Sequence, residues 1–222
     1  MRDAERRLTD SWTQNAEAWT EAVREGAIPS RRAGTDAAIV EAVVRGLPPG
    51  GRVLDVGCGE GWLVRALAAV GVAAEGVDAS APLVAAAVDA GGTFRVLDYE
   101  AAADAPERLG GPFDVAVFNF SLLGEDVVGA LRAARQRLAP GGRVVVQTVH
   151  PLSVGAPYAD GWREETFAAF GDGFGPMPWY FRTFGSWLRV LAAAGLTATE
   201  AIEPVDAGAP LSLILDAEAA HA

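Results

Sequence analysis

The sequence predicts an α/β fold with a doubly wound, seven-stranded, mostly parallel sheet. Strand-like and helix-like segments alternate over most of the 222 residues, which is the pattern of a wound parallel sheet. The crossover connections between parallel strands should be right-handed. A chain of this length buries roughly 70% of its unfolded surface as one domain. We therefore expect a single domain over residues 1–222.

A helical section is expected over residues 1–49, ahead of the sheet. Residues 5–24 follow a helical pattern that puts Trp12, Ala16 and Trp19 on one face, and that face must cover something. A second helix begins near Thr35, which is a plausible N-cap. We interpret this section as a cap over the core.

The core alternates strands and helices over residues 50–150. The expected strands lie at 52–56, 73–78, 93–98, 113–119 and 143–149, with helices between them at 60–70, 80–90, 100–109 and 125–138. Beyond residue 182, a helix at 183–194 and two strands near 197–203 and 211–216 complete the chain.

The segment 151–182 has no clear period but is rich in aromatic residues. It holds eight of the chain's 18 aromatic residues, which are Tyr158, Trp162, Phe167, Phe170, Phe174, Trp179, Tyr180 and Phe181. A long connection in a compact domain is more often a binding loop or lid than a linker. We interpret the segment as a substrate lid; the alternative is a loop that its aromatic side chains fix to the core.

Composition excludes several classes of partner. A net charge of −11 disfavours nucleic acid, because sequence-independent affinity for phosphates requires basic patches. One cysteine, Cys58, and two histidines give neither a disulfide nor a metal cluster, so no metal is expected. No segment resembles a signal peptide or a membrane span. We expect a cytoplasmic protein, monomeric or homodimeric.

The most informative motif is a strand that runs into glycines, from Val53 to Gly61. Glycines at 57, 59 and 61 suit a backbone that turns sharply against a ligand. A dinucleotide fingerprint has the spacing G-x-G-x-x-G, which differs from this one. Asp55 precedes the glycines and would be awkward beside a pyrophosphate but favourable beside a cation. The sequence therefore predicts a cofactor that is positively charged near this loop.

Three further strand ends carry polar side chains. Asp78 ends the second strand, where a carboxylate accepts hydrogen bonds from ribose hydroxyls. Asp98 and Tyr99 close the third strand, where a side chain can meet an adenine edge. Asn119 and Phe120 end the fourth strand, beside the first, at the crevice where strand order reverses.

These motifs together resemble those of class I S-adenosylmethionine-dependent methyltransferases, in order, over about residues 50–150. The matching segments are 53–61, 76–80, 98–99, 113–119 and 138–143. The resemblance implies the sheet order 3-2-1-4-5-7-6 with the last strand antiparallel, and S-adenosylmethionine as cofactor. The cofactor-binding residues that it implies are Arg31, Asp55, Gly57, Cys58, Gly59, Asp78, Ala79, Asp98, Tyr99, Asn119 and Phe120.

Several of these residues have simpler interpretations. Asp55 could bond backbone amides across the glycine turn, and Cys58 could be a small residue tolerated between glycines. Asp78 could cap the next helix, although Ser80 is the better candidate. Asp98 could merely terminate a strand.

The methyl acceptor is expected to be a small molecule, methylated on oxygen or nitrogen. His150 follows the fifth strand and is the candidate general base; the alternative is a loop histidine bonded to backbone. The aromatic stretch from Trp179 and the pair His150-Pro151 resemble small-molecule members of the family. The predicted acceptor contacts are Tyr158, Trp162, Trp179, Tyr180 and Arg182. The alternatives are an RNA or protein methyltransferase, a nicotinamide-dependent oxidoreductase and a non-catalytic nucleotide-binding domain.

Overall fold

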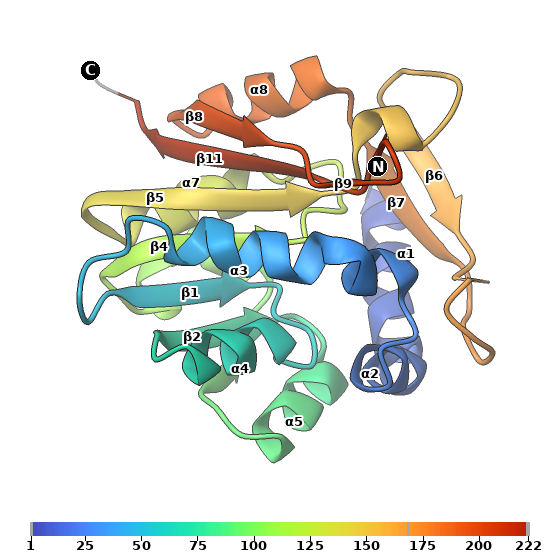
Figure 1. Ribbon diagram of the computed structural model, residues 1–222, viewed down its shortest axis with the longest axis horizontal. Helices are drawn as coiled ribbons and strands as arrows, with labels where there is room; N and C mark the ends of the chain where they lie inside the picture. Colours follow the sequence, from blue (N-terminus) through green and yellow to red (C-terminus); the bar gives the residue numbers. More distant parts are fainter. Residues whose placement is uncertain (1, 168, 221–222) are drawn as a thin grey trace.

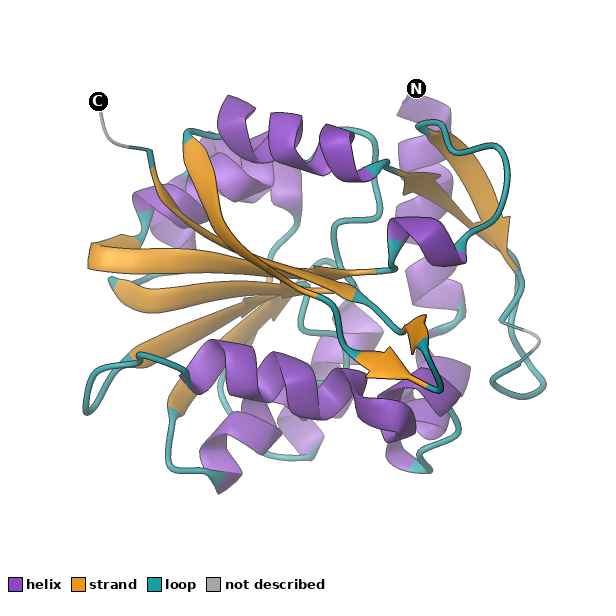
Figure 2. Cartoon of the chain, turned by 45° about the horizontal axis from the view of Figure 1, so that its top comes forward, coloured by secondary structure: helices purple, strands orange, loops and turns teal. Residues whose placement is uncertain are grey.

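A seven-stranded sheet lies between two layers of helices in the computed structural model, which describes residues 2–167 and 169–220 (Figures 1 and 2). Its strands are β1 (Arg52–Val56), β2 (Ala73–Asp78), β3 (Phe94–Val96), β4 (Phe113–Asn119), β5 (Leu138–Thr148), β8 (Leu196–Ile202) and β11 (Leu213–Ala219). They are ordered β3-β2-β1-β4-β5-β11-β8, and β11 is antiparallel to both neighbours. The predicted fold class and strand order are confirmed.

Helices cover both faces of the sheet, and the two N-terminal helices lie beyond one end of its strands. The helices are α1 (Arg2–Gln14), α2 (Ala16–Arg24), α3 (Asp36–Val44), α4 (Trp62–Ala69), α5 (Ala81–Asp89), α6 (Tyr99–Asp104), α7 (Val128–Gln136) and α8 (Phe184–Ala193). Helices α3 and α4 pack on one face through a buried cluster that includes Ile39 and Leu67. Helices α6, α7 and α8 pack on the other face through a cluster that includes Leu131 and Trp187.

The N-terminal helices α1 and α2 stand beyond the carboxyl ends of the parallel strands (Figure 1). The predicted helix over 5–24 is broken at Asn15, whose side chain pairs with the backbone of Gly175: Gly175 N–H donates to Oδ1 over 2.7 Å, and Nδ2 donates to the carbonyl over 3.1 Å. The backbone of Asn15 still bonds as in a helix: its N–H donates to the carbonyl of Ser11 over 2.9 Å, and its carbonyl accepts the N–H of Trp19 over 2.8 Å. The two helices are thus joined by a turn at one residue, whose side chain is held by Gly175. The break lets α1 and α2 cover different parts of the same site.

Other expected boundaries also move, for local reasons. Thr35 makes no side-chain cap bond to α3: its backbone is already helical, and the chain over Arg31–Thr35 leads into α3 after a kink at Gly34, where φ is +143°. The helix expected at 100–109 stops at Asp104, and a 3₁₀ turn, Pro106–Leu109, follows, since the residue before a proline avoids helical geometry. Strand β5 begins at Leu138 instead of residue 143.

The segment 151–182 contains regular structure that its sequence did not indicate. After a 3₁₀ turn at Pro151–Ser153, the strands β6 (Gly161–Glu165) and β7 (Met177–Phe181) pair as an antiparallel hairpin, and β7 packs beside α1 (Figure 1). A smaller hairpin joins β9 (Val205–Asp206) to β10 (Ala209–Pro210). Among the described residues, no helix has the length and apolar character that a bilayer crossing requires.

Candidate active site

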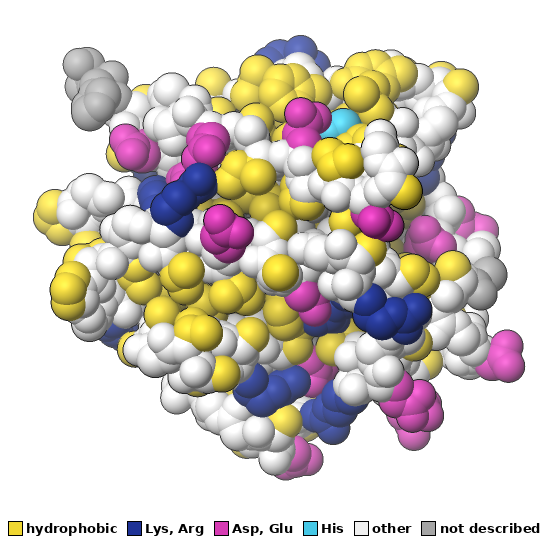
Figure 3. Space-filling view, in the orientation of Figure 1, with side chains coloured by type: hydrophobic (Ala, Val, Ile, Leu, Met, Phe, Trp, Pro, Cys, Tyr) yellow, Lys and Arg dark blue, Asp and Glu magenta, His cyan; other side chains and the backbone are white. Residues whose placement is uncertain are grey.

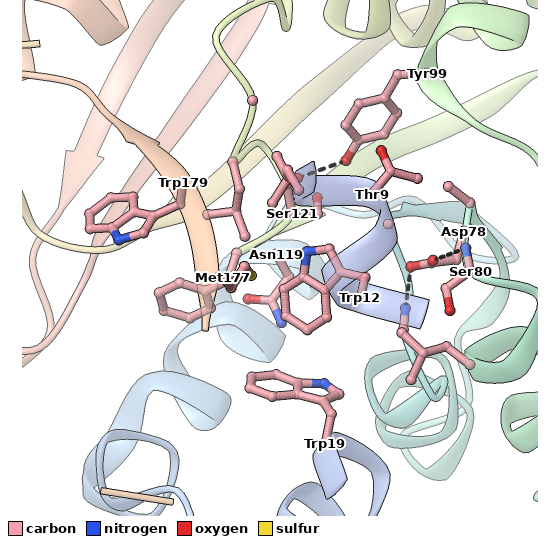
Figure 4. A pocket seen from close by; sticks show the side chains of 18 of the residues that line it. Thr9, Trp12, Trp19, Asp78, Ser80, Tyr99, Asn119, Ser121, Met177 and Trp179 are labelled. Atoms are coloured by element: carbon pink, nitrogen blue, oxygen red, sulfur yellow. Dashed lines mark hydrogen bonds between the residues drawn. The ribbon is translucent and has the colours of Figure 1, made fainter. Parts of the chain in front are cut away.

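A cavity of about 1420 Å³ opens at the carboxyl ends of β1, β2 and β4. Its walls also include α1, α2 and the β6–β7 hairpin (Figure 4). The two N-terminal helices and the expected lid therefore both contribute to the cavity. Pockets for one drug-sized ligand span roughly 300–1,000 Å³. The cavity therefore has room for two ligands side by side.

The glycine loop after β1 is held against the tip of β2. The N–H groups of Gly57 and Cys58 both donate to the carbonyl of Val77, over 2.7 and 3.0 Å. Gly57 has a φ of +82°, and a Cβ there would lie 2.3 Å from the Cβ of Ser121. Gly59 has a φ of +55°, and its Cβ would meet only the indole nitrogen of Trp19, at 3.8 Å. The sequence needs glycine at 57 for packing and at 59 for its turn.

Asp78 ends β2 and organises the loop. Its Oδ2 accepts the N–H of Gly59 and its Oδ1 accepts the N–H of Ser80, each over 2.8 Å. Burial raises the pKa of this carboxyl, while those two N–H groups oppose the rise. Each oxygen keeps one lone pair for a further donor such as a ribose hydroxyl. Asp78 thus positions the helix start, where Ser80 is the N-cap residue but makes no side-chain cap bond.

Asp55 is the buried acid of the site. It is 1% exposed, and its Oδ1 has no hydrogen-bond partner among the described residues. Burial, and then the charge of Asp78, raise the pKa of Asp55 from 3.8 to about 8. A carboxylate in such a position is stabilised by a cationic ligand group. Among the described residues, Asp55 makes no hydrogen bond to the amides of the turn.

The floor of the cavity is formed by the ends of β4 and α6. Tyr99 donates through its hydroxyl to the carbonyl of Ser121 over 3.1 Å, and the Ser121 hydroxyl donates to Val56 over 2.7 Å. Burial raises the pKa of Tyr99. Asp98 caps α6 by accepting the N–H of Ala101 over 2.7 Å. Asp98 therefore caps α6 and also lines the cavity.

Two residues at the end of β4 line the cavity, one with an amide oxygen that bonds no described residue and one with a positive φ. The Oδ1 of Asn119 is buried and has no hydrogen-bond partner among the described residues. Phe120 adopts a φ of +51°, which is rare for a residue with a side chain. Strain of this kind concentrates at ligand sites.

Five aromatic side chains and one methionine enclose the other end of the cavity. We call this set the aromatic wall; it consists of Trp12, Trp19, Phe167, Phe170, Met177 and Trp179. The rings of Trp12 and Trp19 meet edge to face at 5.1 Å between centroids, and Phe167 lies 5.9 Å from Trp19. In Figure 4, Asn119 lies between Met177 and Trp12. The wall therefore adjoins the end of β4.

The predicted cofactor residues come together in this cavity. All eleven of them line it: Arg31, Asp55, Gly57, Cys58, Gly59, Asp78, Ala79, Asp98, Tyr99, Asn119 and Phe120. Arg31 pairs with Asp36 over 2.9 Å and stacks on Trp62 at 4.2 Å, so its guanidinium already has partners. Of the predicted acceptor contacts, Trp179 also lines the cavity.

His150 does not join this group. It is 3% exposed and lies outside the cavity lining, although its neighbour Val149 belongs to it. Its Nδ1 accepts the N–H of Leu152 over 3.2 Å, and its Nε2 lies 2.7 Å from Oε1 of Glu203. Both ring nitrogens are thus engaged away from the cavity, which matches the alternative of a loop histidine.

The four remaining predicted acceptor contacts also lie outside the cavity lining. Arg182 donates to the carbonyls of Gly124 and Glu125, over 2.6 and 2.7 Å. Trp162 and Tyr180 pair across the hairpin, with ring centroids 5.6 Å apart. Tyr158 is half exposed and accepts the N–H of Phe184 over 3.0 Å.

Several lining residues were not predicted as site residues. Trp12 and Trp19 were assigned only to a covering face, and Ser121 carried no signal at all. The helical spacing of the two tryptophans was the available signal, but what they cover depends on how α1 and α2 dock. Among the described residues no group of three or more His, Cys, Asp or Glu side chains is arranged to hold a metal.

A family model described as a methyltransferase domain matches residues 31–201. The chain belongs to this family. With the class I strand order, it is an S-adenosylmethionine-dependent methyltransferase. The alternatives of an oxidoreductase and of a non-catalytic nucleotide-binding domain are thereby set aside.

Solved structures resemble this methyltransferase along nearly their whole length. An S-adenosylmethionine-dependent methyltransferase from Mesorhizobium loti is 26% identical, with a TM-score of 0.59 over 83% of this chain and 98% of that one. The CcbJ methyltransferase from Streptomyces caelestis is 21% identical, with a TM-score of 0.62 over 87% and 91%. Magnesium protoporphyrin IX methyltransferase from Synechocystis is 19% identical, with a TM-score of 0.67 over 95% and 97%. No curated protein matches the sequence.

Proposed function

We propose that this methyltransferase transfers a methyl group from S-adenosylmethionine to a small-molecule acceptor that lies against the aromatic wall. The observation that carries the proposal is the composition of the cavity: a polar end built on the glycine loop and an aromatic end built on α1, α2 and the hairpin. Its volume of about 1420 Å³ suits a cofactor and an acceptor together.

The residues of the polar end fit the cofactor. We assign the ribose hydroxyls to the spare lone pairs of Asp78, and the cationic amino group to the buried carboxylate of Asp55. Asp98 and Tyr99 would flank the adenine, and Asn119 and Phe120 would lie near the sulfonium. S-adenosylmethionine supplies an activated methyl group, so the protein's main work is alignment and exclusion of water.

The aromatic wall would serve that work by excluding water from the acceptor. Phe167 and Met177 are 3% and 4% exposed, so they form a dry backing behind the tryptophans. We assign no general base, because the imidazole of His150 is turned away from the cavity.

A small acceptor is also what some structural neighbours use. One of them is described as a glycopeptide N-methyltransferase complexed with S-adenosylmethionine, and another as acting on magnesium protoporphyrin IX. An RNA acceptor is disfavoured by the net charge of −11.

The test is a screen of small-molecule acceptors by mass spectrometry, which looks for a methyl-sized mass gain that depends on S-adenosylmethionine. Calorimetry with S-adenosylhomocysteine checks the cofactor assignment separately. The proposal fails if RNA or a protein gains the methyl group while the small molecules do not. A steep salt dependence of RNA binding would point the same way.

A further inference from the structure

Acidic side chains are concentrated at the cavity and not over the whole molecule. Of the chain's 29 acidic and 18 basic residues, 12 acidic and 3 basic ones line the cavity, which leaves 17 and 15 elsewhere. The face seen in Figure 3 carries both kinds of side chain, interspersed. The negative charge of the protein is therefore mostly a property of the site.

The three arginines in the lining offset little of this charge. Arg31 pairs with Asp36, which is itself one of the twelve lining acids, and Arg6 pairs with Asp3 over 2.5 Å. Arg163 donates to the carbonyl of Pro157 over 2.6 Å, with its guanidinium 5.0 Å from the ring of Phe181. Among the described residues of the lining, Arg163 is thus the one guanidinium without a carboxylate partner that an anionic acceptor would meet.

The cofactor accounts for only part of the acidic set. Asp55 and Asp78 lie at the glycine loop, where a cationic cofactor binds by the proposed function. Other acids belong to different elements: Asp10 on α1, Asp126 before α7, and Glu164 on β6. These three form no ion pair among the described residues and are exposed to solvent, so they add a negative, solvent-screened potential at the rim of the cavity.

The aromatic wall favours the same kind of ligand. Tryptophan faces attract cations through their negative π-systems. Trp12 and Trp19 meet edge to face, so their two ring planes stand 83° apart and present faces in two directions. Such a corner can hold an ammonium group and an apolar body together.

Asn119 supplies the third element. Its Oδ1 is buried without a partner among the described residues, and Figure 4 shows the side chain between Met177 and Trp12. An amide oxygen accepts hydrogen bonds and donates none. The oxygen therefore matches an acceptor that carries an N–H or O–H group, whereas the Nδ2 of the same side chain is a donor and can bond an oxygen.

We propose that the acceptor is an apolar amine, that is, a primary or secondary amine attached to an aromatic or aliphatic body. The inference rests on the proposed function and adds to it the class of substrate. The acids draw the ammonium form into the cavity, the aromatic wall covers the apolar body, and Asn119 accepts an N–H and orients the nitrogen.

The transfer balances without a protein base. The bound ammonium loses one proton to water, and the nitrogen lone pair then forms the new N–C bond while the S–C bond breaks. The sulfur keeps the bonding electrons and becomes a neutral thioether, and the product is a methylated ammonium that releases its second proton to solvent. Turnover should therefore rise with pH towards the pKa of the acceptor amine.

The experiment compares three probes that share one apolar body: naphthylethylamine, naphthylethanol and naphthylpropionate. Calorimetry first measures the binding of S-adenosylhomocysteine, and each probe is then titrated into the loaded protein. We expect the amine to bind at least about tenfold more tightly than the alcohol, the carboxylate to give no heat, and only the amine to weaken with added salt.

A charge-neutralised variant sharpens the test. The triple variant Asp10→Asn, Asp126→Asn, Glu164→Gln should weaken amine binding about fivefold and leave the alcohol unchanged. A matched control, Glu17→Gln, Glu21→Gln, Glu41→Gln, removes three exposed acids outside the cavity lining and should bind the amine like the parent.

The outcomes separate the two proposals. If S-adenosylhomocysteine itself does not bind, the proposed function fails. If it binds but the amine shows no advantage over the alcohol, or the control variant weakens amine binding as much as the triple variant, the proposed function stands and the amine inference is wrong.

Discussion

The backbone N–H of Gly59 donates to the carboxylate of Asp78 over 2.8 Å, and this bond ties the loop after β1 to the tip of β2. Asp78 accepts the N–H of Ser80 at the same time, so one side chain fixes both the glycine loop and the start of α5. A ligand that binds between the two loops meets a carboxylate that is already oriented. This arrangement reduces the entropy cost of binding.

Replacement of Asp78 should remove cofactor affinity. Asp78→Asn keeps the shape of the side chain but loses the charge and one acceptor oxygen, so we expect S-adenosylhomocysteine to bind about 100-fold more weakly, from the loss of charge-assisted hydrogen bonds worth about 1.5–3 kcal/mol each. Calorimetry measures the affinity, and circular dichroism checks that the variant remains folded. An unaltered affinity would show that the site assignment is wrong.

The two loop glycines should differ in how they tolerate alanine. Gly57→Ala would place a Cβ 2.3 Å from the Cβ of Ser121, at a φ of +82°, so we expect it to destabilise the fold by several kcal/mol. Gly59→Ala has no contact nearer than 3.8 Å and should cost about 1–2 kcal/mol from its backbone conformation alone.

Thermal and urea unfolding measure both effects. Gly26→Ala is the control, because Gly26 has a φ of +66° and nothing within 4 Å of the added Cβ. The Gly26→Ala variant measures the loss of stability that comes from the backbone conformation alone, without a packing clash. Equal destabilisation by the alanines at 57 and 59 would contradict the packing role of Gly57.

The sheet was predictable because each of its features is local. A buried strand followed by glycines, and acids at two strand ends, specify β1, β2 and their loops by sequence alone, and the crossover rule sets their handedness. The eleven predicted cofactor residues line one cavity because the carboxyl ends of parallel strands meet at one edge of the sheet.

The acceptor end was harder to predict, because side-chain direction alternates along extended chain. Trp179 lines the cavity, and Tyr180, which follows it on β7, does not. Val149 and His150 differ in the same way after β5. Adjacent side chains on a strand point to opposite faces of the sheet. The aromatic content of the segment does not predict which of two adjacent side chains faces the cavity. Recognition of the β6–β7 hairpin would have separated them.

Trp12 and Trp19 illustrate a different limit. Their helical spacing indicated a covered face, but the side chain of Asn15, at the turn between α1 and α2, bonds the backbone of Gly175, 160 residues along the chain. No local pattern contains such a partner. The roof of the site is therefore a tertiary property of the chain.

His150 should matter for stability and not for proton transfer. His150→Ala removes a buried ring that bonds Leu152 and Glu203, so we expect a loss of about 1–3 kcal/mol in unfolding free energy. Turnover at saturating substrate should keep its dependence on pH between about 6 and 9. A lost acidic limb in that pH profile would restore the base assignment.

Arg182 should act as an anchor for the loop between β4 and α7. Its guanidinium donates to the carbonyls of Gly124 and Glu125, and the guanidinium carbon lies 5.1 Å from the ring centroid of Trp187. Arg182 is 3% exposed. Arg182→Met should cost about 2–4 kcal/mol, because it leaves buried carbonyls without donors. Arg182→Lys keeps the charge but not the planar fork, and we expect only partial rescue.

Unfolding in urea measures the loss for both Arg182 variants. If Arg182 contacted the acceptor instead, the lysine variant would raise KM at parental stability. A parental melting temperature in Arg182→Met would contradict the anchoring role.

Asp55 should couple cofactor affinity and stability to pH in opposite directions. Burial raises its pKa from 3.8 to about 8, so without ligand the folded chain holds a proton between these values where the unfolded chain does not. Because the folded state then binds more protons, stability falls as pH rises from about 4 to 8. The cofactor's cationic amino group requires the ionised form, so affinity should rise over the upper part of the same range, by up to about tenfold per pH unit. Above about pH 8 the amino group loses its own charge and the rise should end.

Asp55→Asn separates these effects in one variant. The amide buries no charge, so we expect a higher melting temperature at pH 8, by an amount that corresponds to about 1–3 kcal/mol. It should bind S-adenosylhomocysteine more weakly at pH 8 and should lack the rise in affinity between about pH 6 and 8. Differential scanning calorimetry and titration calorimetry across pH measure the two quantities on the same protein. A variant that keeps the parental pH dependence of binding would show that the group that responds to pH is not Asp55, and that the cation binds elsewhere in the cavity.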